Sequence, residues 1–505
     1  MNELFVKPTT FLLPLWGVLL FLGITAKGHA APSPESDALR YDAVVDQIDP
    51  GGVLFGYVSV EGDLTRMVEY LDSFMIDQRK FDKSVPEFDL KALLEISGFD
   101  SISALGMSSI RFEGGFRNKV YLHCPEGRKG FLSLFGSESQ PFDVLKLAPS
   151  GSDFVMQQDI SLKTFYDDVL MQALSGDPLT GKSPLGPQGM MLRMIAEGFM
   201  KQPLHPELSL TVEKLLVDMD TTLTFIVDAN PQAMMILPDT NGLQIPKLNG
   251  IAMLDGLGWV VDEWMKVAES KSSQNKDFSH QYVKIIANQN LRGFQIDLSS
   301  FSKKEKKELQ ELGWEKAILA HHIPSGKLIA SSSKKFVSQV FNAKAKLAKD
   351  PVFKKTMQGL PLKGTAMSYL SPVFQVELRK VMKAAIDLQK SEKGNLEVAM
   401  SMLDIFLPEG AQGEGVATMH TEEGLLTVSN SMFSNKSKIL LSAAAPLLVG
   451  VSTFTLMKPV TRMVKRIERP LPERKNDEGL ESNKRTPFPE IEGRQFNDER
   501  KKPGK

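Results

Sequence analysis

Four segments of the chain share one pattern of hydrophobic and polar positions. In each, a short apolar run typical of a buried strand is followed by a polar residue and then by apolar residues at helical spacing. Val53–Val60, followed by the apolar positions of Leu64–Leu71, shows the pattern first. It recurs in residues 153–174, 328–347 and 366–388. Each segment therefore predicts a strand, a helix cap and an amphipathic helix.

Two further segments alternate apolar and polar residues on either side of a glycine turn. They are Ser109–Leu122, which turns at Glu113-Gly114-Gly115, and Val416–Asn430, which turns at Glu422-Glu423-Gly424. This pattern is typical of β-hairpins, which build antiparallel sheet. We predict an α+β fold: two related halves of antiparallel sheet, with amphipathic helices packed on one face of it.

A stretch rich in Gly, Pro and Met, residues 176–206, separates the first two helix-containing segments from the later ones. The chain has 505 residues, which exceeds an average domain and favours two units. We therefore expect an N-terminal α+β half at residues 31–175 and a C-terminal α+β half at residues 207–435, with residues 176–206 as the connector.

The N-terminus has the features of an export signal. Lys7 precedes an apolar run, Phe11–Thr25, and Gly28 and Ala30 supply the small residues that cleavage requires. Residues 1–30 are therefore predicted to be a signal peptide. An uncleaved membrane anchor is the alternative, although the run is shorter than the ~20 residues that span a bilayer.

A second apolar stretch, Ile439–Met457, contains no charged residue and predicts one C-terminal transmembrane helix. Pro446 and Gly450 weaken this prediction, so a buried core helix is the alternative. More basic residues follow the stretch than precede it, which places residues 458–505 on the cytoplasmic side as a disordered tail. We expect a single-pass protein of the bacterial inner (cytoplasmic) membrane, with its body in the periplasm or extracytoplasmic space.

Composition narrows the function classes. The net charge is −1, and no basic cluster interleaved with aromatic residues stands out, so nucleic acid is not an expected partner. Cys124 is the single cysteine, which excludes an intramolecular disulfide. The membrane is the expected partner, together with an envelope protein or a lipid, and the oligomeric state is left open.

Sequence motifs give no catalytic, metal-ligating or cofactor-binding assignment. Gly176–Ser183 fits the phosphate-loop pattern, but that loop must join a strand to a helix, whereas the residues before it have a helical pattern. His123-Cys124 and His321-His322 are adjacent pairs, and neighbouring strand residues point to opposite faces. Neither pair is therefore expected to act on one substrate or one metal ion.

A methionine-rich segment is the one candidate binding feature. Its apolar residues lie on a predicted short helix, and methionine suits both irregular cores and adaptable apolar grooves. A core or lid helix, an apolar groove for a ligand or partner, and a soft-metal site are the alternatives. The groove would consist of Met190, Met191, Met194, Ile195 and Phe199.

Three segments resemble a family of bacterial exported, membrane-anchored proteins that is defined as a domain of unknown function. They are Leu93–Phe135, with its Gly98-Phe99-Asp100 phrase before a hairpin, Asp350–Pro372, and the final hairpin Glu414–Ser431. The resemblance spans most of residues 40–435. It implies an exported protein with this α+β architecture, and it brings no catalytic residues.

We therefore expect a membrane-anchored envelope protein, non-enzymatic and without a cofactor, whose ectodomain binds a protein partner or an apolar ligand. Two alternatives stay open. One is an envelope hydrolase whose site is assembled from residues distant in sequence. The other is a transmembrane signal carrier whose tail meets cytosolic partners.

Overall fold

The computed structural model describes residues 34–439, apart from 84, 86, 137, 176–182, 205–207, 209, 218–219, 237–241, 275–282, 297–301, 304–305, 308–315, 389–395 and 411. The predicted signal peptide, the tail and all of the predicted transmembrane helix except Ile439 lie outside these residues. Within the described part of the chain, no helix is long and apolar enough to cross a membrane.

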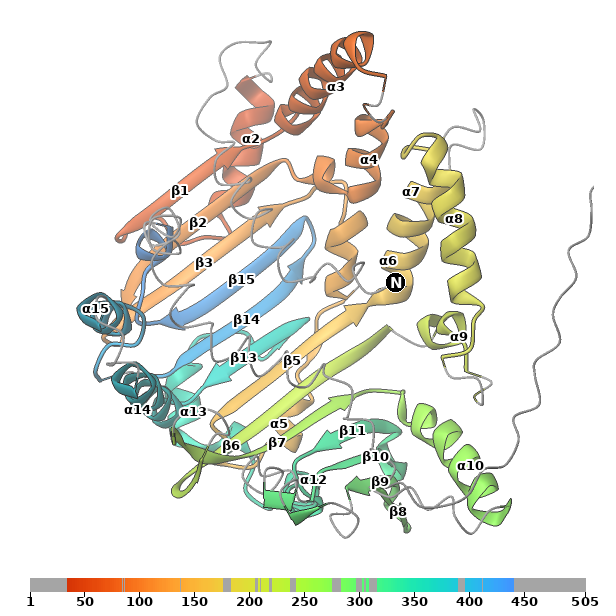
Figure 1. The fold of residues 1–505 in the computed structure, drawn as a ribbon. Coiled ribbons are helices and arrows are strands. Elements are labelled where there is room, and N and C mark those ends of the chain that lie inside the picture. The colour runs from red at the N-terminus through yellow and green to blue at the C-terminus, as the bar shows by residue number, and fades with distance from the viewer. Residues whose placement is uncertain are drawn as a thin grey trace, which may run out of the picture. The chain divides into compact units, whose positions relative to one another are not determined.

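One large sheet organises the described residues (Figure 1), and every neighbouring pair of its strands is antiparallel. In spatial order, its strands are β1 (Leu54–Ser59), β2 (Ala104–Phe112), β3 (Gly115–His123), β15 (Gly424–Ser431), β14 (Glu414–Thr421), β13 (Ala366–Leu370), β5 (Phe154–Ser161), β6 (Asp220–Ile236), β7 (Gln244–Leu254), β11 (Lys327–Ser331), β10 (Ile318–His322), β9 (Leu291–Ile296) and β8 (Val283–Ala287). A separate short pair joins β4 (Gln140–Pro141) to β12 (Lys363–Gly364).

One α-helix, α2, precedes the first strand, and the other described α-helices lie in the connections between strands. Their bounds are α2 (Pro34–Val45), α3 (Asp63–Phe81), α4 (Leu90–Ser97), α5 (Val144–Leu147), α6 (Leu162–Phe165), α7 (Gln172–Ser175), α8 (Pro187–Met200), α9 (Val212–Val217), α10 (Gly258–Gln274), α12 (Lys334–Asn342), α13 (Pro351–Thr356), α14 (Pro372–Leu388) and α15 (Leu396–Phe406). The α+β class with a large antiparallel sheet is thus confirmed.

Three parts of the chain share one connectivity: a strand, then helices, then a hairpin whose first strand pairs with that initial strand. They are β1 to β3, β5 to β7, and β13 to β15. They include three of the four segments predicted from hydrophobic spacing. The fourth, β11 with α12, differs, because β11 pairs with β10 and β7.

The local signals explain how these units form. Ser371 caps α14 by accepting a hydrogen bond from the Phe374 amide at 3.0 Å, and Pro372 is the first helical residue. Glu113 and Gly114 both adopt positive φ, which matches the two-residue turn between β2 and β3.

The strands of the later chain do not form a separate sheet. β13 to β15 lie between β3 and β5, so strands from both predicted halves belong to one sheet. The β3–β15 pair runs from Phe116↔Ser431 to His123↔Gly424, and the β13–β5 pair joins Ala366 to Gln158. These pairings connect residues more than 200 positions apart in the sequence.

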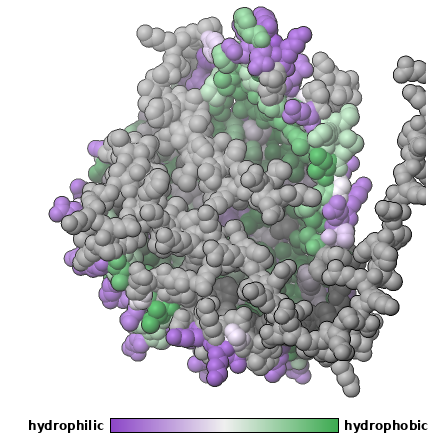
Figure 2. All heavy atoms as spheres, viewed as in Figure 1, coloured by the Kyte–Doolittle hydropathy of each residue, from purple (hydrophilic) through white to green (hydrophobic). Residues whose placement is uncertain are grey.

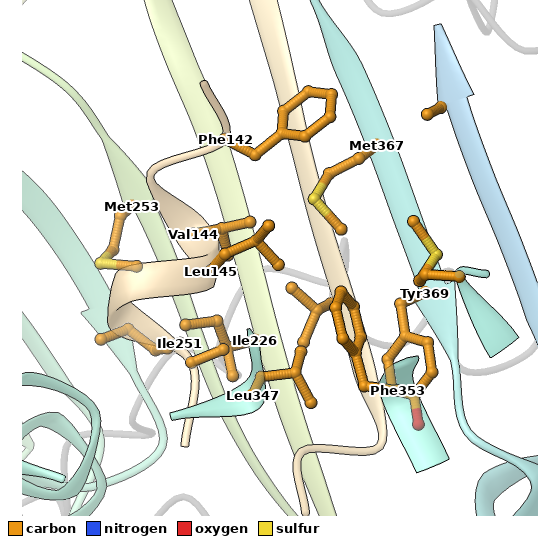
Figure 3. Close-up of a cluster of buried hydrophobic side chains, with 14 of the residues drawn as sticks. Phe142, Val144, Leu145, Ile226, Ile251, Met253, Leu347, Phe353, Met367 and Tyr369 are labelled. Atoms are coloured by element: carbon orange, nitrogen blue, oxygen red, sulfur yellow. The ribbon is translucent and has the colours of Figure 1, made fainter. Parts of the chain in front are cut away.

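The hydrophobic core lies on one face of the sheet, which we call the covered face. Helices α2, α5 and α12 pack against it, and Phe353 of α13 meets Tyr369 of β13 in an edge-to-face contact at 5.1 Å. Figure 3 shows part of this cluster, in which Val144 and Leu145 of α5 lie among side chains from the strands. The covered-face residues of the strands include Ala104, Tyr121, Val155, Ile226, Ile251, Met253, Ile329, Met367, Ala417 and Val428.

The prediction that the helices pack on one face is wrong. α10 packs on β9 to β11 from the opposite side, because its Asp262 pairs with His321 at 2.8 Å and its Glu269 with Arg292 at 3.1 Å. His321 and Arg292 are register partners, and their side chains alternate with the buried Ala320 and Leu291. The physical reason is that α10 has an apolar side of its own, with Val261, Met265 and Ala268 buried, which packing against β9 to β11 removes from water.

Candidate ligand-binding surface

The face of the sheet opposite the core is apolar over β2, β5 and β6 but is not buried. Burial alternates over the first four residues of β5, where Val155 and Gln157 are buried and Phe154 and Met156 are partly exposed. A sheet with one solvated face ordinarily places polar residues there. Here the partly exposed positions are apolar instead. We call this set of partly exposed apolar residues on β2, β5 and β6 the open face. It comprises Leu105, Met107, Phe154, Met156, Leu223, Phe225 and Val227.

The register joins these residues into neighbouring groups. Phe154 lies opposite Val227, and Met156 opposite Phe225, on β5 and β6. On β2, Leu105 and Met107 lie opposite Leu122 and Val120 of β3. Between the two groups, the same face of β14 and β15 carries Thr418 and Thr427, which are hydrogen-bonded to each other at 3.0 Å. The open face therefore has two apolar patches, and the strip of β14 and β15 between them carries Val416 and Leu425 as well as hydroxyls.

Helices at one end of the strands add further exposed apolar surface. Figure 1 shows α3, α4 and α6 to α9 in a row along that end, and Figure 2 shows hydrophobic side chains over the same region. On α3, Tyr70 and Phe74 are separated by one helical turn and are 66% and 60% exposed. Soluble surfaces seldom expose contiguous apolar patches of this kind without a binding role.

The five residues of the predicted groove all lie on α8. Met190, Met191, Met194, Ile195 and Phe199 are between 57% and 64% exposed, whereas Met200 at the end of the helix is buried. These exposed fractions rule out a core position for the five side chains. Hydrophobic spacing located the helix correctly but could not show whether its apolar side is covered.

The adjacent histidine pairs behave as strand neighbours do. His321 bonds Asp262 through Nδ1, whereas His322 bonds Ser325 at 2.7 Å and stacks on Phe341 with a centroid distance of 3.8 Å. Burial lowers the pKa of His322. Among the described residues, no group of three His, Cys, Asp or Glu side chains is placed to hold a metal ion.

Cys124 and the phosphate-loop match also have structural surroundings. Cys124 is 1% exposed, and burial raises the pKa of its thiol to about 11, so it is a protonated core side chain at neutral pH. Ser183 follows the helical segment α7, not a strand, and its hydroxyl donates to the Ala173 carbonyl at 3.1 Å. Gly176–Lys182 lie outside the described residues.

A polar cavity of about 740 Å³ lies where β5, β6 and β7 meet the β4 segment. Its acidic residues are Glu138, Asp159, Asp220 and Asp255. Asp255 pairs with Lys327, and Thr222 donates to Asp159 at 2.8 Å. Burial raises the pKa of Asp159; the hydrogen bond from Thr222 opposes the rise, and the Asp255 carboxylate adds to it. The described lining contains no histidine or cysteine to pair with its hydroxyls as a nucleophile and base.

A buried polar cluster that the sequence patterns did not predict lies on the open-face side of β2 and β3. The Asn118 carboxamide accepts from Ser109 Oγ at 2.7 Å and from the Asn435 amide at 2.9 Å, and it donates to Ser431 Oγ and the Phe433 carbonyl at 3.0 Å each. We call Ser109, Asn118, Ser431 and Asn435 the exit clamp. The polar run just before the apolar segment Ile439–Met457 was the only sequence signal for it.

Comparisons with models of protein families, with characterised proteins and with solved structures gave no match to this chain. The function is therefore argued from the site alone.

Proposed function

We propose that this chain is an exported protein, anchored in the bacterial cytoplasmic membrane by Ile439–Met457, whose body binds an apolar ligand outside the cytoplasm. The signal-like residues 1–30 and the basic residues after Met457 support this topology. The proposal includes related units in the body, for which the strand, helix and hairpin connectivity shared by β1 to β3, β5 to β7 and β13 to β15 is the support.

The open face is the observation that carries the binding role. Its Phe154, Met156 and Phe225 bring apolar area to the surface of a sheet whose other face already holds a full core. Full burial of an exposed side chain of this size gains ~1.5–3 kcal/mol, and these partly exposed side chains gain a fraction of that each, so an apolar occupant of the face is favoured. The exposed side chains of α8 and α3 are apolar as well, and they add to the apolar surface of the molecule.

A non-enzymatic role fits the chemistry of the described residues better than the hydrolase alternative. The polar cavity beside β5, β6 and β7 supplies carboxylates and hydroxyls, and the His321–Asp262 pair lies on β10 and α10 rather than in its lining. Its carboxylates can act as bases, but the described lining places no histidine or cysteine beside its hydroxyls.

Ligand binding can be tested with the purified full-length protein and an environment-sensitive fluorescent fatty acid. We expect saturable binding that Met156→Lys weakens at least tenfold, because a charge on the open face has to be desolvated when an acyl chain binds. Lys146→Gln on the exposed side of α5 is the matched control and should leave the affinity unchanged. Absence of saturable binding, or equal binding by both variants, would overturn the proposal.

The topology has its own test. Protease added to intact spheroplasts should digest the body and leave residues 458–505 protected, because that segment is expected inside. Protection of the body, or digestion of the tail, would contradict it.

A further inference from the structure

The chain leaves the sheet on the side of the open face. β15 ends at Ser431, and the following residues cross to β3 and β2. There the Asn435 amide donates to Ser109 Oγ and to Asn118 Oδ1, both at 2.9 Å. Ser109 and Asn118 are register partners on the same face as Met107 and Val120. The apolar segment Ile439–Met457 therefore begins beside one patch of the open face.

The exit clamp holds this point of departure firmly. Asn435 Nδ2 also donates to the Ser108 and Lys119 carbonyls, at 3.3 and 3.1 Å. Asn118 and Asn435 are 2% and 8% exposed, so their hydrogen bonds are made away from water. Loss of one partner in such a network leaves buried donors or acceptors unsatisfied, which is strongly disfavoured. The backbone at Asn435 is thus held against β2 and β3.

Only a short tether separates the clamp from the apolar segment. Residues 435–439 are helical, so Ile439 lies ~6 Å along the helix from Asn435, and even a fully extended chain would reach only ~14 Å. Lys436 and Lys438 are exposed in this tether, and Lys438 forms an ion pair with Glu414 at 3.6 Å. If Ile439–Met457 enters a bilayer, the Met107 end of the open face cannot be far from its surface, and the two lysines lie at the depth of anionic headgroups.

We propose that the exit clamp holds the open face against the bilayer that anchors the chain, and that the occupant of the open face is the acyl chain of a lipid from that bilayer. This inference rests on the proposed anchor and on the proposed apolar binding. To the proposed function it adds that the ligand is a lipid acyl chain and that the ligand reaches the open face from the bilayer. The apolar patches contact the acyl chains, while Lys436 and Lys438 contact the headgroups.

The test uses the full-length chain in vesicles of phosphatidylcholine and phosphatidylglycerol that contain lipids with a quencher on the acyl chain. An environment-sensitive dye is attached to Met107→Cys on the open face or, as the matched control, to Lys146→Cys on the covered side; Cys124 is buried and does not compete for the label. We expect at least threefold stronger quenching at position 107 than at position 146. Equal quenching at the two positions would overturn the inference.

A second variant tests the tether. Twelve Gly/Ser residues inserted between Lys438 and Ile439 leave the clamp and the anchor intact but release the body from the surface. Quenching at position 107 should then fall at least twofold, and unchanged quenching would contradict the role of the short tether. Binding of the fluorescent fatty acid in detergent solution should not change. If that binding persists while position 107 is never quenched, the membrane-facing inference fails and the proposed function stands; if it is absent, the proposed function itself fails.

The remaining occupants give distinct results, and each would overturn the inference. A dye at position 107 that is shielded from water but not quenched by lipid indicates that Ile439–Met457 itself covers the face. Shielding that rises with protein density in the vesicles indicates a second copy of the chain.

Discussion

At the scale of single residues, Asn118 shows how one side chain joins distant parts of the chain. It bonds to β2 through Ser109 and to the chain after β15 through Ser431, Phe433 and Asn435. A carboxamide can donate and accept at once, which neither a carboxylate nor an apolar side chain can do. The sequence alone shows an ordinary polar residue in a strand, because its partners after β15 lie more than 300 positions away.

Asn118→Ala tests this residue. We expect the free energy of unfolding to fall by ~2–4 kcal/mol, because several buried groups lose their partners at once. Asn342→Ala is the control: that exposed side chain at the end of α12 bonds only Ser338 in the same helix, so its loss should cost less than ~0.5 kcal/mol. Urea denaturation of both variants measures the difference, and equal losses would show that the clamp contributes no special stability.

His420 supplies a pH-dependent term. Burial, and then the positive charge of Arg128, lower its pKa below the ordinary value of 6.5. The unfolded chain therefore binds more protons than the folded chain once the pH falls below 6.5, and stability is lost in that range. His420→Gln should reduce the fall in melting temperature between pH 7 and pH 5. An unchanged slope would place the acid sensitivity in other groups, among which His123 and His322 have pKa values lowered in the same direction.

At the scale of helices and strands, the sequence predicted correctly those turns and helix starts that depend on a few neighbouring residues. The hairpin turn at Glu113-Gly114 and the Ser371-Pro372 start of α14 formed as their residue types require. β6 and β7 were not predicted. These long strands pair with each other as a hairpin, and on their outer sides with β5 and β11, which lie farther away in the sequence.

The cap of α12 gives a test at this scale. Ser333 accepts a hydrogen bond from the Phe336 amide at 3.1 Å and begins a helix whose Phe336, Val337 and Val340 are buried. Ser333→Ala should lower the free energy of unfolding by ~1 kcal/mol, and Ser333→Asp should restore most of it, because both Ser and Asp accept at an N-cap. Chemical denaturation decides this, and a loss that Asp does not recover would assign the effect to packing instead.

α8 separates stability from binding. Met191 and Met194 are exposed, so Met191→Lys with Met194→Lys should leave the unfolding free energy within ~0.5 kcal/mol of the parent. If α8 forms part of the ligand surface, the fluorescent fatty acid should bind at least threefold more weakly. Gln188→Lys, exposed on the same helix, controls for the added charge. A drop in stability without a change in affinity would remove α8 from the binding surface.

At the scale of the whole molecule, the order of strands in the sheet decides what can fold alone. β15 pairs with β3 and β13 pairs with β5, so a fragment of residues 34–175 would leave β3 and β5 without these neighbours. Unpaired strand edges promote aggregation. We expect residues 34–175 and 207–439 to be insoluble when expressed separately. The chain 34–439 should melt in one transition by circular dichroism, and two soluble fragments with independent transitions would contradict this.

The sequence by itself determined the class of the fold, the positions of several strand and helix starts, and the existence of an apolar helix at Met190 to Phe199. These depend on spacing, caps and turn residues that act within a few positions. Only the tertiary structure decided that α10 covers the second face at one end of the sheet, that the apolar side chains of α8 stay exposed, and that those of the open face stay partly exposed. The tertiary structure also decided that Asn435, through its hydrogen bonds to β2 and β3, fixes the point at which the chain leaves the sheet. Burial and hydrogen-bond satisfaction are properties of pairings between residues hundreds of positions apart, and local spacing carries no record of those pairings.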